Sequence, residues 1–113
     1  MIRLNLEKPP SVNALFSTDW KTKRRFRSKA YENWLSNAET ALWMTKWKPI
    51  TGPVNITITV EDAGRVDLAN HEKSICDFLV KHGLIEDDKR SIVRKITLQW
   101  GNVKGCVVEV VPA

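Results

Sequence analysis

The stretch from Arg65 to Arg90 holds most of the side chains in this sequence that are suited to chemistry. Asp67 stands before an amphipathic pattern, and an acidic run, Glu86–Asp88, stands after it. On a helix that turns about 100° per residue, one stripe would carry Asp67, Asn70, Lys73 and Asp77. Carboxylates that meet from separate parts of a chain suit a hard cation such as Mg²⁺, which takes oxygen ligands and keeps several waters. The pattern therefore indicates a metal site made of carboxylates.

A helix and the turn after it would have to position these acids. The opposite side of the helix is apolar and carries Leu68, Ile75, Phe78 and Leu79, which is the pattern of a helix packed on a sheet. Gly83 is placed to end the helix, and the apolar pair Leu84–Ile85 should fold back over its last turn. We therefore expect the acidic run Glu86–Asp88 to reach a rim beside Asp67.

The same stretch resembles the central motif of the RusA family of Holliday-junction resolvases, which reads D-x-D-N-x-x-K-x-x-x-D, then a glycine-containing turn, then D-D. The residues that match it in order are Asp67, Asn70, Lys73, Asp77, Gly83, Asp87 and Asp88. The family's second aspartate falls on Ala69, which cannot bind a metal. Outside the motif, Pro9–Asn13 resembles the family's early P-P-S-x-N turn, and Lys104–Gly105 lies where the family has a terminal hairpin.

This resemblance implies an Mg²⁺-dependent endodeoxyribonuclease, with Mn²⁺ as a substitute, that resolves four-way DNA in recombination and repair. It further implies a phage- or prophage-encoded protein that acts as a homodimer. By resemblance, the catalytic residues are Asp67, Lys73 and Asp88, the metal ligands are Asp67, Asp87 and Asp88, and the residues that orient ligands or waters are Asn70 and Asp77. Ala69 keeps an alternative open, namely a catalytically impaired protein of the same fold that binds branched DNA.

Each of these residues also has a plain structural interpretation. Aspartate is a favoured N-cap, so Asp67 could simply begin the helix. The pair Asp87–Asp88 could be a solvated turn, as charged residues between two elements usually are. Lys73 and Asp77 are spaced as an exposed i,i+4 ion pair, which contributes a few tenths of a kcal/mol. The family order favours function for Asp67, Asp88 and Lys73, and it leaves Asp77 undecided.

Two further types of side chain in the stretch are weaker candidates. Glu72 is a tempting substitute for the acid missing at Ala69, but on an ideal helix it projects about 130–140° away from Asp67. His71 points toward the apolar side and is expected to be packed. His82, near the helix end, is expected to interact with the helix dipole.

A second group of residues favours a polyanionic partner. A dense run of cations follows the early proline turn and is flanked by Trp20 and Phe26: it comprises Lys21, Lys23, Arg24, Arg25, Arg27 and Lys29. Together with Arg65, we expect these residues to contact the DNA backbone. The segment Ser11–Ser28 has no regular pattern, so it is predicted to be a long loop that becomes ordered on binding.

Composition agrees with one cytosolic, basic domain that spans residues 1–113. The chain has 113 residues, 42% hydrophobic residues and a net charge of +5, which suits one core and a negatively charged partner. Cys76 and Cys106 are expected to be buried, reduced thiols. No signal peptide and no membrane span is expected. Assembly on RNA is a weaker possibility, because the acidic cluster would oppose it.

Hydrophobic periodicity predicts an α/β protein of the α+β kind, with a mixed sheet and two main helices in the order β-α-β-α-β-β. The predicted strands are 2–6, 54–60, 92–100 and 106–111, and the predicted helices are about 29–47 and 68–82. Turn residues between the last two strands predict that these strands form an antiparallel hairpin.

Overall fold

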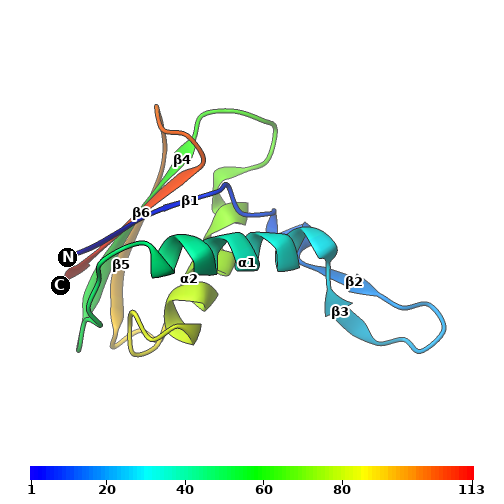
Figure 1. The fold of residues 1–113 in the computed structure, drawn as a ribbon, viewed down its shortest axis with the longest axis horizontal. Helices are drawn as coiled ribbons and strands as arrows, with labels where there is room; N and C mark the ends of the chain where they lie inside the picture. The colour runs from blue at the N-terminus through cyan, green and yellow to red at the C-terminus, as the bar shows by residue number, and fades with distance from the viewer.

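A four-stranded mixed sheet with two α-helices on one face forms the body of the protein (Figure 1). The computed structural model describes residues 1–113. Its elements are β1 (Ile2–Leu6), the 3-10 helix η1 (Val12–Ala14), β2 (Phe16–Thr18), β3 (Arg25–Arg27), α1 (Lys29–Trp43), β4 (Val54–Glu61), the 3-10 helix η2 (Leu68–His71), α2 (Glu72–Lys81), β5 (Val93–Gly101) and β6 (Cys106–Pro112). The predicted fold class and the order of the main elements are confirmed.

The strand order in the main sheet is β1-β6-β4-β5. Strand β6 pairs antiparallel with both β1 and β4, whereas β5 pairs parallel with β4 at the edge. The predicted hairpin between the last two strands is therefore wrong. The turn after β5 passes over the end of β4, where the Glu61 carboxylate accepts a hydrogen bond from the Gly105 amide at 2.8 Å.

Side-chain chemistry explains why β6 takes the central position. Its core-facing residues Cys106, Val108 and Val110 are fully buried, which suits a strand that is paired on both sides. Strand β5 carries exposed Arg94 and Lys95, and charged residues are a common protection for an edge strand. The turn signals were recognised from the sequence, but they do not determine which strand the chain joins next.

The core lies between the sheet and the two helices. In β4, Val54, Ile56, Ile58 and Val60 are completely buried, as their alternation predicts. The helices cover them with Trp34, Leu35 and Leu42 from α1 and Ile75, Phe78 and Leu79 from α2. Burial of one such large apolar side chain contributes roughly 1.5–3 kcal/mol. This packing fixes the orientation of α2, so its polar side must face outward.

Helix α1 ends at Trp43, earlier than predicted. The hydroxyl of Thr45 donates to the carbonyl of Ala41 at 2.8 Å, and Trp47 packs against the core from outside the helix. Trp43, the last residue of the helix, is 88% exposed. No helix has the length and apolar character needed to cross a membrane.

The segment Ser11–Ser28, predicted to lack regular structure, contains η1 and an antiparallel hairpin of β2 and β3. The hairpin projects away from the sheet, at the end of the molecule opposite both termini (Figure 1). Its base is fixed by buried Leu15, whose carbonyl accepts from the Ser28 amide at 2.9 Å. Ser28 also caps α1 by accepting from the Tyr31 amide at 3.1 Å. The prediction of a long loop without regular structure was therefore wrong.

Candidate active site

Asp67 occupies the N-cap position of η2, but its carboxylate makes no capping hydrogen bond. The Asn70 amide instead donates to the Asp67 backbone carbonyl at 3.0 Å. Asp67 is exposed, and Asn70 is half-buried one turn later. The capping interpretation thus does not account for the carboxylate, which is left available for another partner.

Lys73 and Asp77 form the i,i+4 ion pair that their spacing suggests, with Nζ and Oδ2 separated by 3.4 Å. Their side chains are 56% and 42% exposed, so the pair contributes little to stability. Burial raises the pKa of the Tyr31 hydroxyl, and Asp77 raises it further, while Arg27 and Lys73 lower it. The polar side of α2 therefore lies within electrostatic reach of the hairpin base.

A small hollow of about 250 Å³ joins these elements. Phe16 and Arg27 line it from the hairpin, Tyr31 from α1, and Asp77 and Lys81 from α2. The Arg27 guanidinium carbon lies 5.8 Å from the centre of the Tyr31 ring. The hollow thus joins the hairpin to the polar side of α2, with Arg27 and Lys81 as its cations and Asp77 as its acid.

The turn after α2 has the predicted construction. Gly83 has a positive φ of +75°, and Leu84 and Ile85 are buried. The three acids that follow differ in their partners: Glu86 Oε1 accepts from the Gly52 amide at 2.9 Å, and Asp87 Oδ1 accepts from the Asp88 amide at 2.7 Å. The exposed carboxylate of Asp88 makes no hydrogen bond to the protein. Asp88 is therefore the acid of this turn that is most available.

The structure does not bring Asp67 and the acidic pair Asp87–Asp88 into one cluster. In the chain, Asp67 precedes η2, whereas the pair follows α2. The acidic turn is attached to the start of β4, since the Val54 amide donates to the Ile92 carbonyl at 2.7 Å. No group of three or more His, Cys, Asp or Glu side chains is placed to hold a metal ion.

The charge of Asp88 reaches the middle of α2 at Cys76. The pKa of this buried thiol is raised to about 12, chiefly by burial, then by Glu72, Asp77 and Asp88. Glu72 Oε1 accepts from the Cys76 thiol at 3.7 Å. The helical-wheel argument against Glu72 assumed an α-helical first turn, but the structure has a 3-10 turn there. Glu72 and Asp88 both raise the pKa of Cys76, so both lie near the side of α2 that carries this thiol.

Both cysteines are free and buried, as predicted. Burial also raises the pKa of Cys106 to about 12. A thiol with such a pKa is almost entirely protonated at neutral pH and is a poor nucleophile or metal ligand. The two cysteines therefore belong to the core.

His71 is packed, as its position predicts, and it connects the central segment to the early proline turn. Its ring is 2% exposed, and Nδ1 lies 3.0 Å from the Pro9 carbonyl oxygen. Burial lowers the pKa of His71. His82, expected to interact with the helix dipole, lies with Nε2 3.5 Å from Glu39. Sequence reasoning missed the contact with Pro9, because the two residues are distant in the chain and no local pattern connects them.

The cations predicted to bind DNA are all exposed. They lie in three parts of the chain. Most lie on the hairpin, Lys29 begins α1, and Arg65 lies in the segment between β4 and η2. The Arg25 guanidinium carbon lies 4.0 Å from the centre of the Phe16 ring. A guanidinium stacked on a ring is held in one orientation while its outer edge stays available for phosphate.

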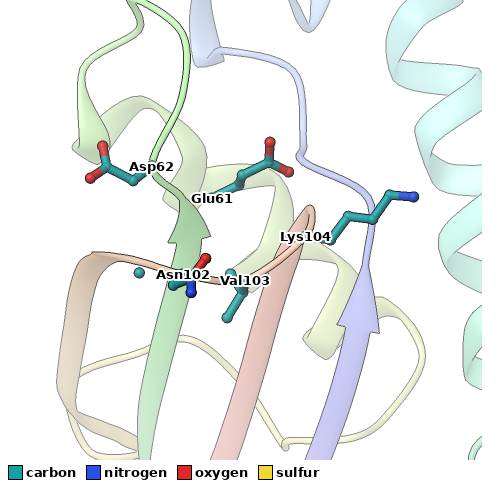
Figure 2. A pocket seen from close by; sticks show the side chains of 6 residues that line it. Glu61, Asp62, Asn102, Val103 and Lys104 are labelled. Carbon is teal, nitrogen blue, oxygen red and sulfur yellow. The ribbon is translucent and has the colours of Figure 1, made fainter.

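Another open hollow, of about 720 Å³, lies over the end of β4 and residues 101–104 (Figure 2). It contains two acids, Glu61 and Asp62, but their carboxylates point apart. Glu61 is also engaged with the Gly105 amide. This hollow therefore does not supply the missing cluster of carboxylates.

Comparison with known proteins identifies the family of this chain. A search among curated proteins found no match to the chain. The family model described as Endodeoxyribonuclease RusA matches residues 7–111, which include the proline turn, the basic hairpin, the central segment and the last strands. The chain therefore belongs to the RusA endodeoxyribonuclease family.

Proposed function

We propose that this protein is an endonuclease that resolves four-way DNA junctions by hydrolysing phosphodiester bonds. Membership of the family supports a nuclease that acts on branched DNA. The observation that carries the assignment to particular residues is that Asp67 and Asp88 are exposed carboxylates without a hydrogen-bond partner in the protein. Acids that stabilised the fold would be engaged, as Glu61 and Glu86 are.

Lys73 is proposed to stabilise the transition state of phosphodiester hydrolysis. Negative charge develops on the phosphate oxygens as the bond breaks, and a positioned ammonium group stabilises that charge. The ion pair with Asp77 keeps Lys73 on the polar side of α2. Asn70, one turn earlier on the same segment, is proposed to orient a water or a carboxylate.

Dependence on Mg²⁺, with Mn²⁺ as a substitute, is part of this proposal. The available donors are carboxylate oxygens, which suit these ions, but one chain holds no complete group of ligands. Mg²⁺ usually needs only one or two carboxylates when water and phosphate supply the remaining ligands. A bound ion would activate water and stabilise the leaving oxygen.

We further propose that the protein acts as a homodimer. The free acids Asp67 and Asp88 flank the η2–α2 segment in the chain, and one chain has no group of three or more such side chains that could hold a metal ion. In a twofold dimer each contact occurs twice, so two copies could place Asp67 of one beside Asp88 of the other. Two equivalent sites would also suit a four-way junction, which requires two symmetric cuts.

The second candidate is a branched-DNA-binding protein without nuclease activity. Ala69 favours it, because this exposed position in η2 offers no ligand where the family has an aspartate. A synthetic four-way junction, incubated with the protein and a series of Mg²⁺ concentrations, separates the two candidates. Paired cuts near the branch point would support the nuclease, whereas tight binding without products at any Mg²⁺ or Mn²⁺ concentration would support the alternative. Failure to bind the junction would contradict both.

A further inference from the structure

The hairpin of β2 and β3 ends in a tip, residues 19–24, that displays a tryptophan to solvent. Trp20 is 83% exposed and belongs to no hydrophobic cluster. The tip does not depend on this ring for its shape. The Asp19 amide donates to the Arg24 carbonyl at 2.9 Å, and the Lys23 amide donates to the Asp19 carbonyl at 2.8 Å. Asp19 Oδ1 also accepts from the Lys21 amide at 2.9 Å.

Cations surround the exposed ring. Lys21, Lys23 and Arg24 are exposed on the same tip, and Lys23 Nζ lies 5.9 Å from the centre of the Trp20 ring. Trp20 takes part in no aromatic pair within the protein. An indole is a large apolar surface, and this ordered turn leaves it exposed to water. The exposed ring is therefore suited to contact with a ligand that covers it.

We propose that Trp20 stacks on a nucleobase exposed at the branch point of the DNA while the neighbouring cations hold the flanking phosphates. Every base has a flat π-face that stacks on an aromatic ring, and such contacts are usual where proteins bind unpaired strands. Bases within a duplex arm are already stacked on their neighbours. The ring would therefore add affinity only where the branch exposes a base. This inference rests on the proposed function, because it names a contact made by the same complex.

A second copy of the chain is a poorer occupant of this tip. Two tips that met would bring Lys21, Lys23 and Arg24 of both copies together, and like charges across a contact oppose association. The projecting hairpin is also the part of the protein most distant from the sheet (Figure 1). Both features favour a polyanion that carries flat rings.

The test compares Trp20→Ala and Trp20→Phe with the wild type. Binding to a fluorescent four-way junction and to a linear duplex of matched sequence would be measured at one fixed salt concentration without divalent cations, so that no DNA is cut. Trp20→Ala should weaken junction binding by about fivefold to 150-fold, the range expected for loss of one base–aromatic stack. Duplex binding should not change, and Trp20→Phe should retain most of the junction affinity.

Trp43→Ala is the matched control. Trp43 is 88% exposed, but it lies at the end of α1 and outside the basic hairpin, so its loss should leave both affinities unchanged. Circular dichroism and sedimentation would verify that every variant is folded and has the oligomeric state of the wild type. A junction with 2-aminopurine at the branch point gives a direct readout: wild type and Trp20→Phe should change its emission, and Trp20→Ala should not.

The outcomes separate this inference from the proposed function. If the wild type does not bind junctions, both fail. If it binds them and Trp20→Ala binds equally well, only the stacking contact is wrong. Equal losses on junction and duplex would mean that Trp20 contacts duplex arms, and a changed oligomeric state would mean that it contacts protein. Either result would overturn the inference.

Discussion

At the scale of single residues, the hydrogen-bond partners separate structural acids from available ones. Glu61 and Glu86 both accept bonds from backbone amides of distant segments, so each stabilises a turn. Asp67 and Asp88 make no such contact. The sequence motif alone indicated Asp67 and Asp88 as ligands, but it could not show that Glu86 is engaged with Gly52. That contact depends on how the turn after α2 meets the start of β4.

Asp88→Asn should abolish cleavage and retain or strengthen junction binding. The change removes a negative charge that would repel phosphate and leaves the shape of the side chain unaltered. Cleavage rates and binding affinities would be measured on one junction, with Asp62→Asn as the control, because Asp62 is an exposed acid in the other hollow. Cleavage by Asp88→Asn at the wild-type rate would remove Asp88 from the site.

Ala69→Asp should lower the Mg²⁺ concentration needed for half-maximal cleavage. Residue 69 lies in η2 beside Asp67 and is exposed, so a carboxylate there would add a ligand at the same end of the helix. Ala69→Asn, which has a similar shape without the charge, should change the requirement far less. If Ala69→Asp does not alter the Mg²⁺ requirement of an active wild type, the site is completed differently, and Glu72→Gln would be the next variant.

At the scale of elements, periodicity predicts where strands and helices occur but not how they pair. The alternation in β4 and the apolar side of α2 were both recognised, because each depends on burial of one face. The pairing of β6 with β4 depends on competition among strands for the centre of the sheet. The short strands β2 and β3 escaped recognition because their pairing rests on Leu15 and Ser28 at the base, and not on an apolar face of their own.

Neutralising Lys23, Arg24, Arg25 and Arg27 together should weaken DNA binding and flatten its salt dependence. If all four contact phosphates of duplex arms, the slope of log affinity against log salt should fall by roughly 3 to 4 units, at about 0.9 per contact. Neutralising Lys46, Lys48, Lys95 and Lys104 removes the same charge from other exposed positions and is the control. Equal slopes for the two variants would mean that the hairpin does not hold the DNA.

The burial of His71 predicts a pH dependence of stability. Burial lowers the pKa of His71, so the folded protein binds fewer protons than the unfolded chain below the ordinary value of 6.5. The contribution of His71 is therefore complete above pH 6.5 and is lost as the pH falls through its lower folded pKa, by at most about 1.4 kcal/mol per pH unit. Urea unfolding between pH 5 and 8 would measure it. His71→Gln should flatten this part of the curve, and an unchanged curve would contradict the assignment.

At the scale of the whole molecule, one chain provides a basic surface and two free acids, but it does not join the acids. The hairpin and the polar side of α2 lie together, since Arg27 and Asp77 line one hollow. In the chain, Asp67 precedes η2 and Asp88 follows α2. The motif predicts both acids in one site, and this stays a prediction, since one chain has no group of three or more such side chains that could hold a metal ion.

Mixing two inactive variants tests whether two copies complete one site. Asp67→Asn and Asp88→Asn should each fail to cut junctions alone. If Asp67 of one copy works with Asp88 of the other, a mixed dimer contains one site with both acids intact and one with neither. Mixing after brief unfolding and refolding should then restore cleavage of one strand. If each site lies within one chain, every site in every dimer lacks an acid and the mixture stays inactive, so restored single-strand cleavage can arise only from a shared site.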